Sequence, residues 1–354
     1  MEEAGRANAQ ERTFSCRQVV MLQRSREAGD VLVIKLGALG DVILSLPHIT
    51  RIVESCPPGR VTLLTAPEYR ELAALVPGLE VVAFPRKGFI AMFQVMRWLL
   101  GRRFRTVFDL QGSTRSLIMT LLTQAELRVG RKAGISYTHV PADLDDSAHA
   151  FQRLNALLDV AGITPATQEM PDYFRDQSSS AVSAWLRKHL PGDRKRVLMH
   201  AGSSSRWQSK RWEEAHFIDL AQQLEARDFS VIWIGGEDDR ELNRRLSKAV
   251  GVDASGVFSY IDLIDLGCHA AFAICNDSGP MHLLSLPGIP VYAFFGPTDW
   301  RRSHAIGQQE HVLINPVPCS PCFLNVCPPE RRHECLADIS SDRVFARLQA
   351  DKLV

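Results

Sequence analysis

The stretch Val31-Leu-Val-Ile-Lys-Leu-Gly-Ala-Leu-Gly-Asp41 decides the fold class of this chain. Its first four residues form a continuous apolar run, typical of a parallel strand that is buried on both faces. A glycine loop follows, and then apolar residues recur at helical spacing, with Asp41 placed to cap the helix. A strand, a glycine loop and a helix in this order predict the first unit of a parallel α/β sheet.

The alternation of strand and helix continues along the chain. Further strands are predicted at residues 61–65, 80–84, 106–110, 127–130, 196–200, 231–234, 272–276 and 290–295, with helices at 211–226 and 340–353. A polar stretch with two prolines, residues 164–175, interrupts the pattern and predicts a linker. We therefore expect an α/β fold of two Rossmann-like domains, residues 31–165 and 175–354, after an N-terminal extension of residues 1–30.

Length and charge narrow the function classes. The chain has 354 residues, which suits two domains of about 150 residues each. Lys and Arg total 41 against 40 for Asp and Glu, so the net charge of +1 gives no reason to expect nucleic acid as a partner. The apolar runs are the length of strands and too short to span a bilayer. Residues 1–30 carry mixed charge and lack the apolar segment of a secretory signal.

Polar side chains follow several of the predicted strands, at the edge where parallel sheets bind ligands. Residues 202–212 form a loop rich in hydroxyls that ends near Lys210, and residues 235–239 place two glycines before Glu237. Residues 275–282 open a helix with free backbone N–H groups, which suits a diphosphate. Each stretch also has a plain structural interpretation, as a solvated loop, a helix cap or a core histidine, and the residues alone leave both open.

Two nucleotide-binding motifs are absent from the sequence. The glycines at 37 and 40 lack the third position of a dinucleotide fingerprint, and no G-x-x-x-x-G-K-[ST] stretch occurs. Asp41 is then either a helix cap or a carboxylate that accepts a proton from a hydroxyl in a cleft. The helix N-terminus favours its ionised form, which makes it a weaker base.

Taken together, these stretches resemble glycosyltransferase family 9, the ADP-heptose:lipopolysaccharide heptosyltransferases. The matching pieces follow the family's order and cover about residues 31–340. They are Lys35-Leu-Gly-Ala-Leu-Gly-Asp-Val-Ile-Leu-Ser-Leu-Pro47, Asp109-Leu-Gln-Gly112, Lys210-Arg-Trp212, Gly235-Gly-Glu237, Asp277-Ser-Gly-Pro-Met-His282 and Phe295-Gly-Pro-Thr-Asp299. The resemblance implies the GT-B architecture, in which two Rossmann-like domains face each other across a cleft.

The resemblance also implies a reaction and its partners. The family transfers heptose from ADP-heptose to the inner core of lipopolysaccharide, with inversion and without a metal or other cofactor. The expected partners are an ADP-sugar donor and a lipid A-core or other glycan acceptor, with no nucleic acid. We expect a cytoplasmic enzyme in peripheral contact with the inner membrane. Consistently, no D-x-D motif follows a strand, since Asp262 and Asp265 fall in a helical pattern.

The family's pattern assigns roles to individual residues. It implies that Asp41 is the catalytic base, with Gly40 and Arg115 on the acceptor side. The donor-binding residues that it implies are Ser203, Lys210, Glu237, Asp277, Ser278, Gly279, His282 and Thr298. Lys210 is expected to bind phosphate and Glu237 to bind ribose. Because the loop at 202–210 is longer than in many members, the choice among Ser203, Ser204 and Ser205 stays open.

Two alternatives to a heptosyltransferase stay open. The chain is then an enzyme that uses another nucleotide sugar to build a surface glycan, or a non-catalytic protein that binds nucleotide sugars. A third alternative, an oxidoreductase, is disfavoured because the dinucleotide fingerprint is missing.

A further feature of the sequence is a C-x2-C-x4-C-x7-C cluster, whose spacing suits a structural zinc site. Its members are Cys319, Cys322, Cys327 and Cys335. No catalytic metal is expected.

Overall fold

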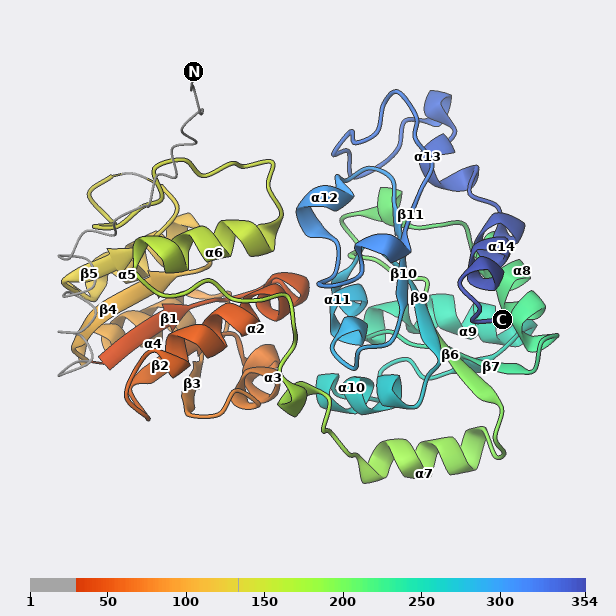
Figure 1. Ribbon diagram of the computed structural model, residues 1–354, viewed down its shortest axis with the longest axis horizontal. Coiled ribbons are helices and arrows are strands. Elements are labelled where there is room, and N and C mark those ends of the chain that lie inside the picture. Colours follow the sequence, from red (N-terminus) through yellow and green to blue (C-terminus); the bar gives the residue numbers. More distant parts are fainter. Residues whose placement is uncertain (1–29, 133) are drawn as a thin grey trace, which may run out of the picture.

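Two parallel β-sheets stand side by side in this chain, one in each half, and helices flank both (Figure 1). The computed structural model describes residues 30–132 and 134–354, so the predicted N-terminal extension lies outside them except for its last residue. The predicted α/β class with two Rossmann-like units is confirmed. The exact domain bounds stay a prediction.

The N-terminal sheet has the strand order β3-β2-β1-β4-β5, and all its pairs are parallel. Its strands are β1 (Asp30–Ile34), β2 (Val61–Thr65), β3 (Leu79–Ala83), β4 (Phe104–Asp109) and β5 (Leu127–Val129). Strand β1 lies in the middle and is buried on both faces, which explains its unbroken apolar run. The chain order reverses at β1, so the loops after β1 and β4 open at a topological switch point.

The C-terminal sheet has the order β11-β10-β9-β6-β7-β8, again with every pair parallel. Its strands are β6 (Lys195–His200), β7 (Phe229–Trp233), β8 (Val252–Asp253), β9 (Phe272–Asn276), β10 (Val291–Phe295) and β11 (Val312–Ile314). Strand β6 holds the position that β1 holds in the other sheet. The loops after β6 and β9 therefore form the second switch point.

Helices connect successive strands in both halves. The N-terminal half contains α2 (Leu39–Glu54), α3 (Arg70–Ala74), α4 (Phe89–Leu100), α5 (Thr114–Leu122) and α6 (Ala150–Val160). The C-terminal half contains α7 (Ser180–His189), α8 (Glu214–Glu225), α9 (Arg240–Ala249), α10 (Tyr260–Cys268), α11 (Gly279–Ser285), α12 (Trp300–Ser303), α13 (Glu334–Ala337) and α14 (Ser341–Ala350). Short 3₁₀ segments are η1 (Pro67–Tyr69), η2 (Asp172–Phe174), η3 (Gln208–Lys210), η4 (Glu237–Asp239), η5 (Gln309–His311) and η6 (Pro329–Arg331). Within the described ranges, no helix is both long and apolar enough to span a bilayer.

Every predicted strand is present within two residues of its expected bounds. Strands β8 and β11 were not predicted, because segments of two and three residues carry no periodic signal. The prediction that Asp41 caps its helix is wrong. Helix α2 begins at Leu39 with Ala38 as its N-cap, so Asp41 lies inside the first turn, where a carboxylate still stabilises the helix dipole. The helix predicted from residue 211 begins only at Glu214, since Arg211 is extended.

The two halves meet through the packing of α2 against α11. One hydrophobic cluster runs through both, from Ile43 on α2 to Met281 on α11. Two glycines make this approach possible. A Cβ at Gly40 would collide with the imidazole of His282, 2.9 Å from its Nε2, and a Cβ at Gly279 would lie 3.0 Å from Leu39 Cβ. Each half thus supplies a glycine that accommodates a side chain of the other.

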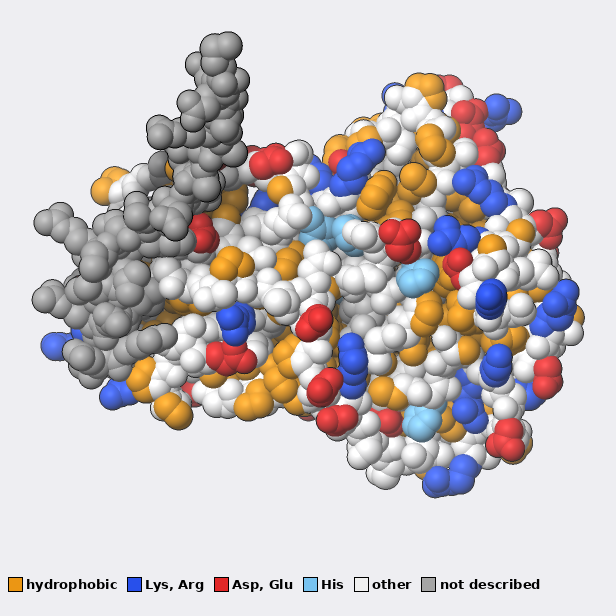
Figure 2. Space-filling view, viewed as in Figure 1, with side chains coloured by type: hydrophobic (Ala, Val, Ile, Leu, Met, Phe, Trp, Pro, Cys, Tyr) orange, Lys and Arg blue, Asp and Glu red, His pale blue; other side chains and the backbone are white. Residues whose placement is uncertain are grey.

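Ring contacts extend the junction on both sides of these helices. Tyr69 stacks on Tyr260 with ring centroids 6.3 Å apart. The imidazole of His149 packs on that of His304 at 4.3 Å, and its Nε2 lies 2.9 Å from the His304 carbonyl oxygen. Figure 2 shows histidine side chains where the two lobes meet. In this structure, the halves are therefore in firm contact.

We predict that Gly40→Ala destabilises the chain by about 1–3 kcal/mol, because the added methyl group overpacks the junction at His282. Urea unfolding of the purified variant measures this difference. Gly101→Ala is the matched control, since a Cβ at Gly101 meets nothing closer than 3.4 Å. In an His282→Ala background the cost of Gly40→Ala should largely disappear, and an unchanged cost would contradict the proposed clash.

Candidate active site

A cleft of about 640 Å³ opens between the halves at the carboxyl ends of β6, β7 and β9. This volume is typical of a site for a small organic ligand. Ala38, Leu39, Gly40 and Tyr69 line it from the N-terminal half. The C-terminal half contributes the predicted residues Ser203, Glu237, Ser278 and Gly279, together with His200, Ser204, Ser205, Asp239, Gly256, Phe258, Tyr260 and Leu263.

Lys210 forms an ion pair at the base of the predicted donor site. Its Nζ lies 2.7 Å from Oδ2 of Asp277, and the Thr298 hydroxyl donates to the same oxygen at 2.6 Å. Both charged side chains are largely buried, with 18% and 7% of their surface exposed. An unpaired buried carboxylate would repel a phosphate, but here the lysine balances it. Asp277 is thus better placed to position Lys210 than to touch an anion itself.

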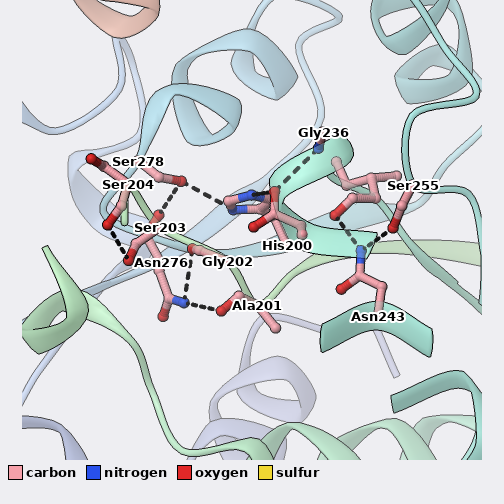
Figure 3. A network of polar contacts seen from close by, with 12 residues as sticks. His200, Ala201, Gly202, Ser203, Ser204, Gly236, Asn243, Ser255, Asn276 and Ser278 are labelled. Atoms are coloured by element: carbon pink, nitrogen blue, oxygen red, sulfur yellow. Dashed lines mark hydrogen bonds and ion pairs between the residues drawn. The ribbon is translucent and has the colours of Figure 1, made fainter. Parts of the chain in front are cut away.

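A second chain of polar contacts links the end of β6 with the loops that follow β7 and β9 (Figure 3). The Ser278 hydroxyl lies 3.1 Å from Nδ1 of His200, and Nε2 of His200 lies 3.4 Å from Oδ2 of Asp239. The same Asp239 oxygen accepts a hydrogen bond from the Gly236 N–H at 3.1 Å. Neither His200 nor Asp239 was among the predicted site residues. A histidine at the end of β6 and an acidic run after two glycines are the signals that were available.

Asn276 holds the loop after β6 in place. Its side-chain amide donates to the Ala201 and Gly202 carbonyls at 2.8 and 3.2 Å, and its Oδ1 accepts from the Trp212 N–H at 2.9 Å (Figure 3). The residue is fully buried. The end of β9 thereby sets the course of the loop that leads to Lys210.

The Ser203 hydroxyl is engaged in hydrogen bonds within its own loop and is not free to bind a phosphate. Ser203 Oγ donates to the Trp207 carbonyl at 2.8 Å and accepts from Arg211 Nε at 3.0 Å. Its side chain therefore closes the loop on itself. Ser204 and Ser205 are exposed and line the cleft, so they are better placed to meet a ligand.

Glu237 lies at the rim of the cleft in η4. Its carboxylate accepts hydrogen bonds from Arg240, at 2.7 Å from Nε and 2.5 Å from Nη2. This hydrogen bonding lowers the pKa of Glu237 and keeps it ionised. Gly256, at φ +67°, faces both side chains and leaves room for them. An ionised, oriented carboxylate suits the hydroxyl pair of a ribose.

His282 lies under Gly40 at the junction of the halves and not on the cleft surface. Burial lowers its pKa to about 4, against the opposing influence of Asp277 and Asp41, while His304 and Lys210 lower it further. The imidazole is therefore neutral at pH 7. Its Nδ1 is buried and finds no hydrogen-bond partner within the described residues.

Asp41 stands exposed in the first turn of α2, one residue after the cleft-lining Gly40. Behind it lies Lys35, which is buried and donates to the Leu110 carbonyl at 3.2 Å. Burial lowers the pKa of Lys35 to about 8, and the Asp41 carboxylate acts against that shift. A carboxylate that faces solvent beside the cleft is free to meet a ligand hydroxyl.

The Asp109-Leu-Gln-Gly112 stretch supports the glycine loop from the next strand. Gln111 Oε1 accepts the N–H groups of Leu36 and Gly37 at 2.8 and 3.1 Å. Asp109 is fully buried and accepts hydrogen bonds from the Gln111 and Gly112 N–H groups at 3.0 and 2.9 Å. The stretch is thus structural, because it fixes the backbone that carries Gly40 and Asp41.

Arg115 follows in the first turn of α5 and is half-buried. Its Nε is buried, as are those of Arg131 and Arg153, and these three nitrogens lack hydrogen-bond partners among the described residues. Arg153 is within electrostatic reach of Asp41, Arg131 and Arg302. Cations from both halves therefore gather on the Asp41 side of the molecule.

The four clustered cysteines surround one small hollow against Gly296. Burial raises the pKa of Cys335 to about 11, and the thiols of the other three add to the effect. Across residues 30–132 and 134–354, no group of three or more His, Cys, Asp or Glu side chains is placed to hold a metal ion. The zinc hypothesis stays a prediction. The loop that carries these cysteines also contacts η3, since the Ser209 hydroxyl donates a hydrogen bond to the Leu324 carbonyl at 2.6 Å.

The family model described as glycosyltransferase family 9 (heptosyltransferase) matches residues 92–333. Among curated proteins, lipopolysaccharide heptosyltransferase 1 of Pseudomonas aeruginosa is 26% identical, over 91% of this chain and 95% of that protein. A family 9 glycosyl transferase of Veillonella parvula superposes with a TM-score of 0.74 at 19% identity, covering 92% and 97% of the two chains. The Escherichia coli heptosyltransferase WaaC with ADP-2-deoxy-2-fluoro heptose gives 0.66 at 17% identity, covering 91% and 99%. The fold predicted as GT-B is thereby confirmed.

We predict that stability falls as the pH drops from about 6.5 towards 4, partly because of His282. Over this range the unfolded chain takes up a proton at His282 and the folded chain does not, since its folded pKa is about 4. The contribution is at most about 1.4 kcal/mol per pH unit. In His282→Asn, urea unfolding between pH 7 and 4 should show a flatter dependence, and two parallel curves would contradict the assignment.

Proposed function

The chain belongs to glycosyltransferase family 9, and from that premise we propose that it transfers heptose from ADP-heptose to the inner core of lipopolysaccharide. The observation that carries the proposal is the contact of α2 with α11, which sets the turn bearing Asp41 beside the helix that follows Asp277. Gly40, next to Asp41, and Ser278, next to Asp277, line the same cleft, so an acceptor-side carboxylate and a donor-side anion site would adjoin it.

Asp41 is the proposed base of an inverting transfer. The acceptor hydroxyl attacks the anomeric carbon, its proton passes to the Asp41 carboxylate, and the bond from that carbon to the diphosphate breaks. The electron pair of the broken bond leaves on ADP. Two features support this role. Asp41 is exposed beside the cleft-lining Gly40, and its carboxylate forms no ion pair with any other described residue.

Lys210 is the proposed stabiliser of the leaving diphosphate. Charge that develops on the diphosphate is best met by a fixed cation already in place. Asp277, whose carboxylate accepts a hydrogen bond from Thr298, holds the ammonium group at the strand ends, which supports that role. The reaction proposed here needs no metal ion, since a lysine of this kind supplies the positive charge. The exposed hydroxyls of Ser204 and Ser205 add donors for the phosphate oxygens.

The nucleoside is assigned to the part of the cleft near Glu237. Phe258, Tyr260 and Leu263 give this part an apolar wall that suits a purine, and the ionised Glu237 suits the ribose hydroxyls. WaaC, one of the similar structures, was solved with an ADP-sugar analogue. This likeness supports an ADP-sugar over the runner-up, a transferase that uses another nucleotide sugar.

The acceptor is assigned to the side of Arg115, Arg131 and Arg153. Guanidinium nitrogens that are buried without partners favour an anionic ligand, such as a phosphorylated or acidic sugar. The proposed acceptor, a lipid-linked core saccharide, would bring such groups to Asp41. It would also bring the enzyme to the cytoplasmic surface of a membrane.

Asp41→Asn should retain ADP binding and lose activity by about 10²–10⁴-fold, because the amide cannot accept the hydroxyl proton. Mass spectrometry of the glycan product measures the rate, and calorimetry measures ADP affinity. Asp342→Asn is the control, since Asp342 is likewise exposed in the first turn of a helix, α14. Full activity of the Asp41 variant would refute the assignment of the base. Binding of the donor without any turnover by the wild type would favour a binding protein.

Glu237→Ala should weaken ADP binding about fivefold to tenfold, as expected for the loss of hydrogen bonds to ribose. Glu241→Ala is a matched control on the adjoining helix. Both glutamates are exposed and pair with an arginine three residues later, Glu237 with Arg240 and Glu241 with Arg244. Calorimetric titration with ADP compares the two. Equal losses in both variants would place the ribose elsewhere.

A further inference from the structure

Helix α4, labelled in the N-terminal half in Figure 1, carries apolar side chains on two faces. One face packs inward through Ala91, Val95 and Leu99. The other carries large apolar side chains that face outward. They are Phe89, Ile90, Phe93 and Leu100, with exposed fractions of 95%, 77%, 66% and 63%. We call this second set the α4 face.

An apolar surface of this kind indicates a binding partner. A surface helix normally turns charged or polar residues to water, whereas a helix that is hydrophobic all round is covered on all sides. Single exposed apolar residues are common, but four on one short helix form a patch. At helical spacing, Phe89, Phe93 and Leu100 fall on one stripe, with Ile90 at its edge.

Cations surround the α4 face. Between residues 84 and 104 the sequence has five basic residues and no acidic one, although the whole chain is nearly neutral. The five are Arg86, Lys87, Arg97, Arg102 and Arg103. All are exposed. Arg86 forms an ion pair with Glu68, and Arg102 forms one with Glu80. Among the described residues, Lys87, Arg97 and Arg103 form no ion pair.

The α4 face begins at the edge of the sheet where the cleft opens. Helix α4 follows the carboxyl end of β3, which lies at the same edge as the carboxyl end of β1. Arg86, in the connecting loop, lies over the Tyr69 ring at 5.6 Å and against Gly37. Tyr69 itself lines the cleft. A surface bound through Phe89 and Ile90 would therefore lie near the mouth of the cleft.

We propose that the α4 face docks on a bilayer with anionic headgroups, with Phe89, Ile90 and Phe93 at the acyl boundary and the cations at the phosphates. Apolar and aromatic side chains beside Lys and Arg are the features of a helix that lies in a membrane interface. A second copy of the chain fits less well, because a symmetric contact would set the two groups of cations against each other. The choice of a bilayer rests on the proposed function, in which the acceptor is lipid-linked.

Co-sedimentation with vesicles tests the proposal. Phosphatidylcholine vesicles with about 30 mol% phosphatidylglycerol provide the anionic surface, and pure phosphatidylcholine provides the neutral one. We expect binding to the anionic vesicles that weakens with salt. Phe89→Ser/Ile90→Ser/Phe93→Ser should lower it at least tenfold, as should Lys87→Glu/Arg97→Glu. The controls Val326→Ser and Arg187→Glu/Lys188→Glu change exposed residues of the other half and should bind like the wild type.

Three results would overturn the proposal. The first is vesicle binding that the triple serine variant retains. The second is self-association of the wild type, seen by analytical ultracentrifugation, that the triple variant abolishes while vesicle binding is unaffected. The third is protection of Phe89 and Phe93 from hydroxyl radicals in the lipid-free monomer, which would mean that the chain itself covers the face.

The Asp41→Asn chain separates this proposal from the proposed function. It keeps the α4 face and lacks the proposed base, so it should bind vesicles normally while it makes no product. If the donor and acceptor are assigned wrongly, vesicle binding still occurs. If the α4 face does not dock, transfer to a water-soluble acceptor still proceeds.

Discussion

The close approach of α2 and α11 is the constraint on which the rest of this structure depends. Both helices start at switch points, where a strand ends and the next connection turns the other way. Their N-terminal ends can touch only because residues 40 and 279 lack a Cβ. This contact sets the turn that bears Asp41 next to the strand end that bears Asp277. Without it, the two halves would be two separate α/β domains with no shared site.

Electrostatic balance governs the donor side of the cleft. Carboxylates are numerous there, and three of them are matched by a cation or a donor group. Asp277 has Lys210 and Thr298, Asp239 has His200 and the Gly236 N–H, and Glu237 has Arg240. An anion that enters this site would meet cations and N–H groups whose positions are already fixed. The acidic residues then serve to hold cations and N–H groups in place before a ligand arrives.

The sequence predicted the strands well because buried parallel strands leave unbroken apolar runs, as Val31 to Ile34 does. It also predicted which strand ends carry polar residues. It did not reveal how those residues pair. Ser203 and Thr298 carry hydroxyls that suit a phosphate, yet both are engaged within the protein. His200 was overlooked because a histidine at a strand end has no pattern of its own. Such pairings depend on loop courses, which Asn276 and Gln111 fix through contacts distant in sequence.

The neutral state of His282 follows from the same junction and bears on Asp41. The imidazole lies between the two halves, within electrostatic reach of both Asp41 and Asp277. An imidazolium there would attract the Asp41 carboxylate and compete with any ligand hydroxyl for it. Burial prevents this, since it lowers the pKa of His282 to about 4. The packing that joins the halves therefore also leaves Asp41 without a cationic partner at that position. The burial of His282 thus has two consequences: its side chain packs between the two halves, and its neutral imidazole does not compete for the Asp41 carboxylate.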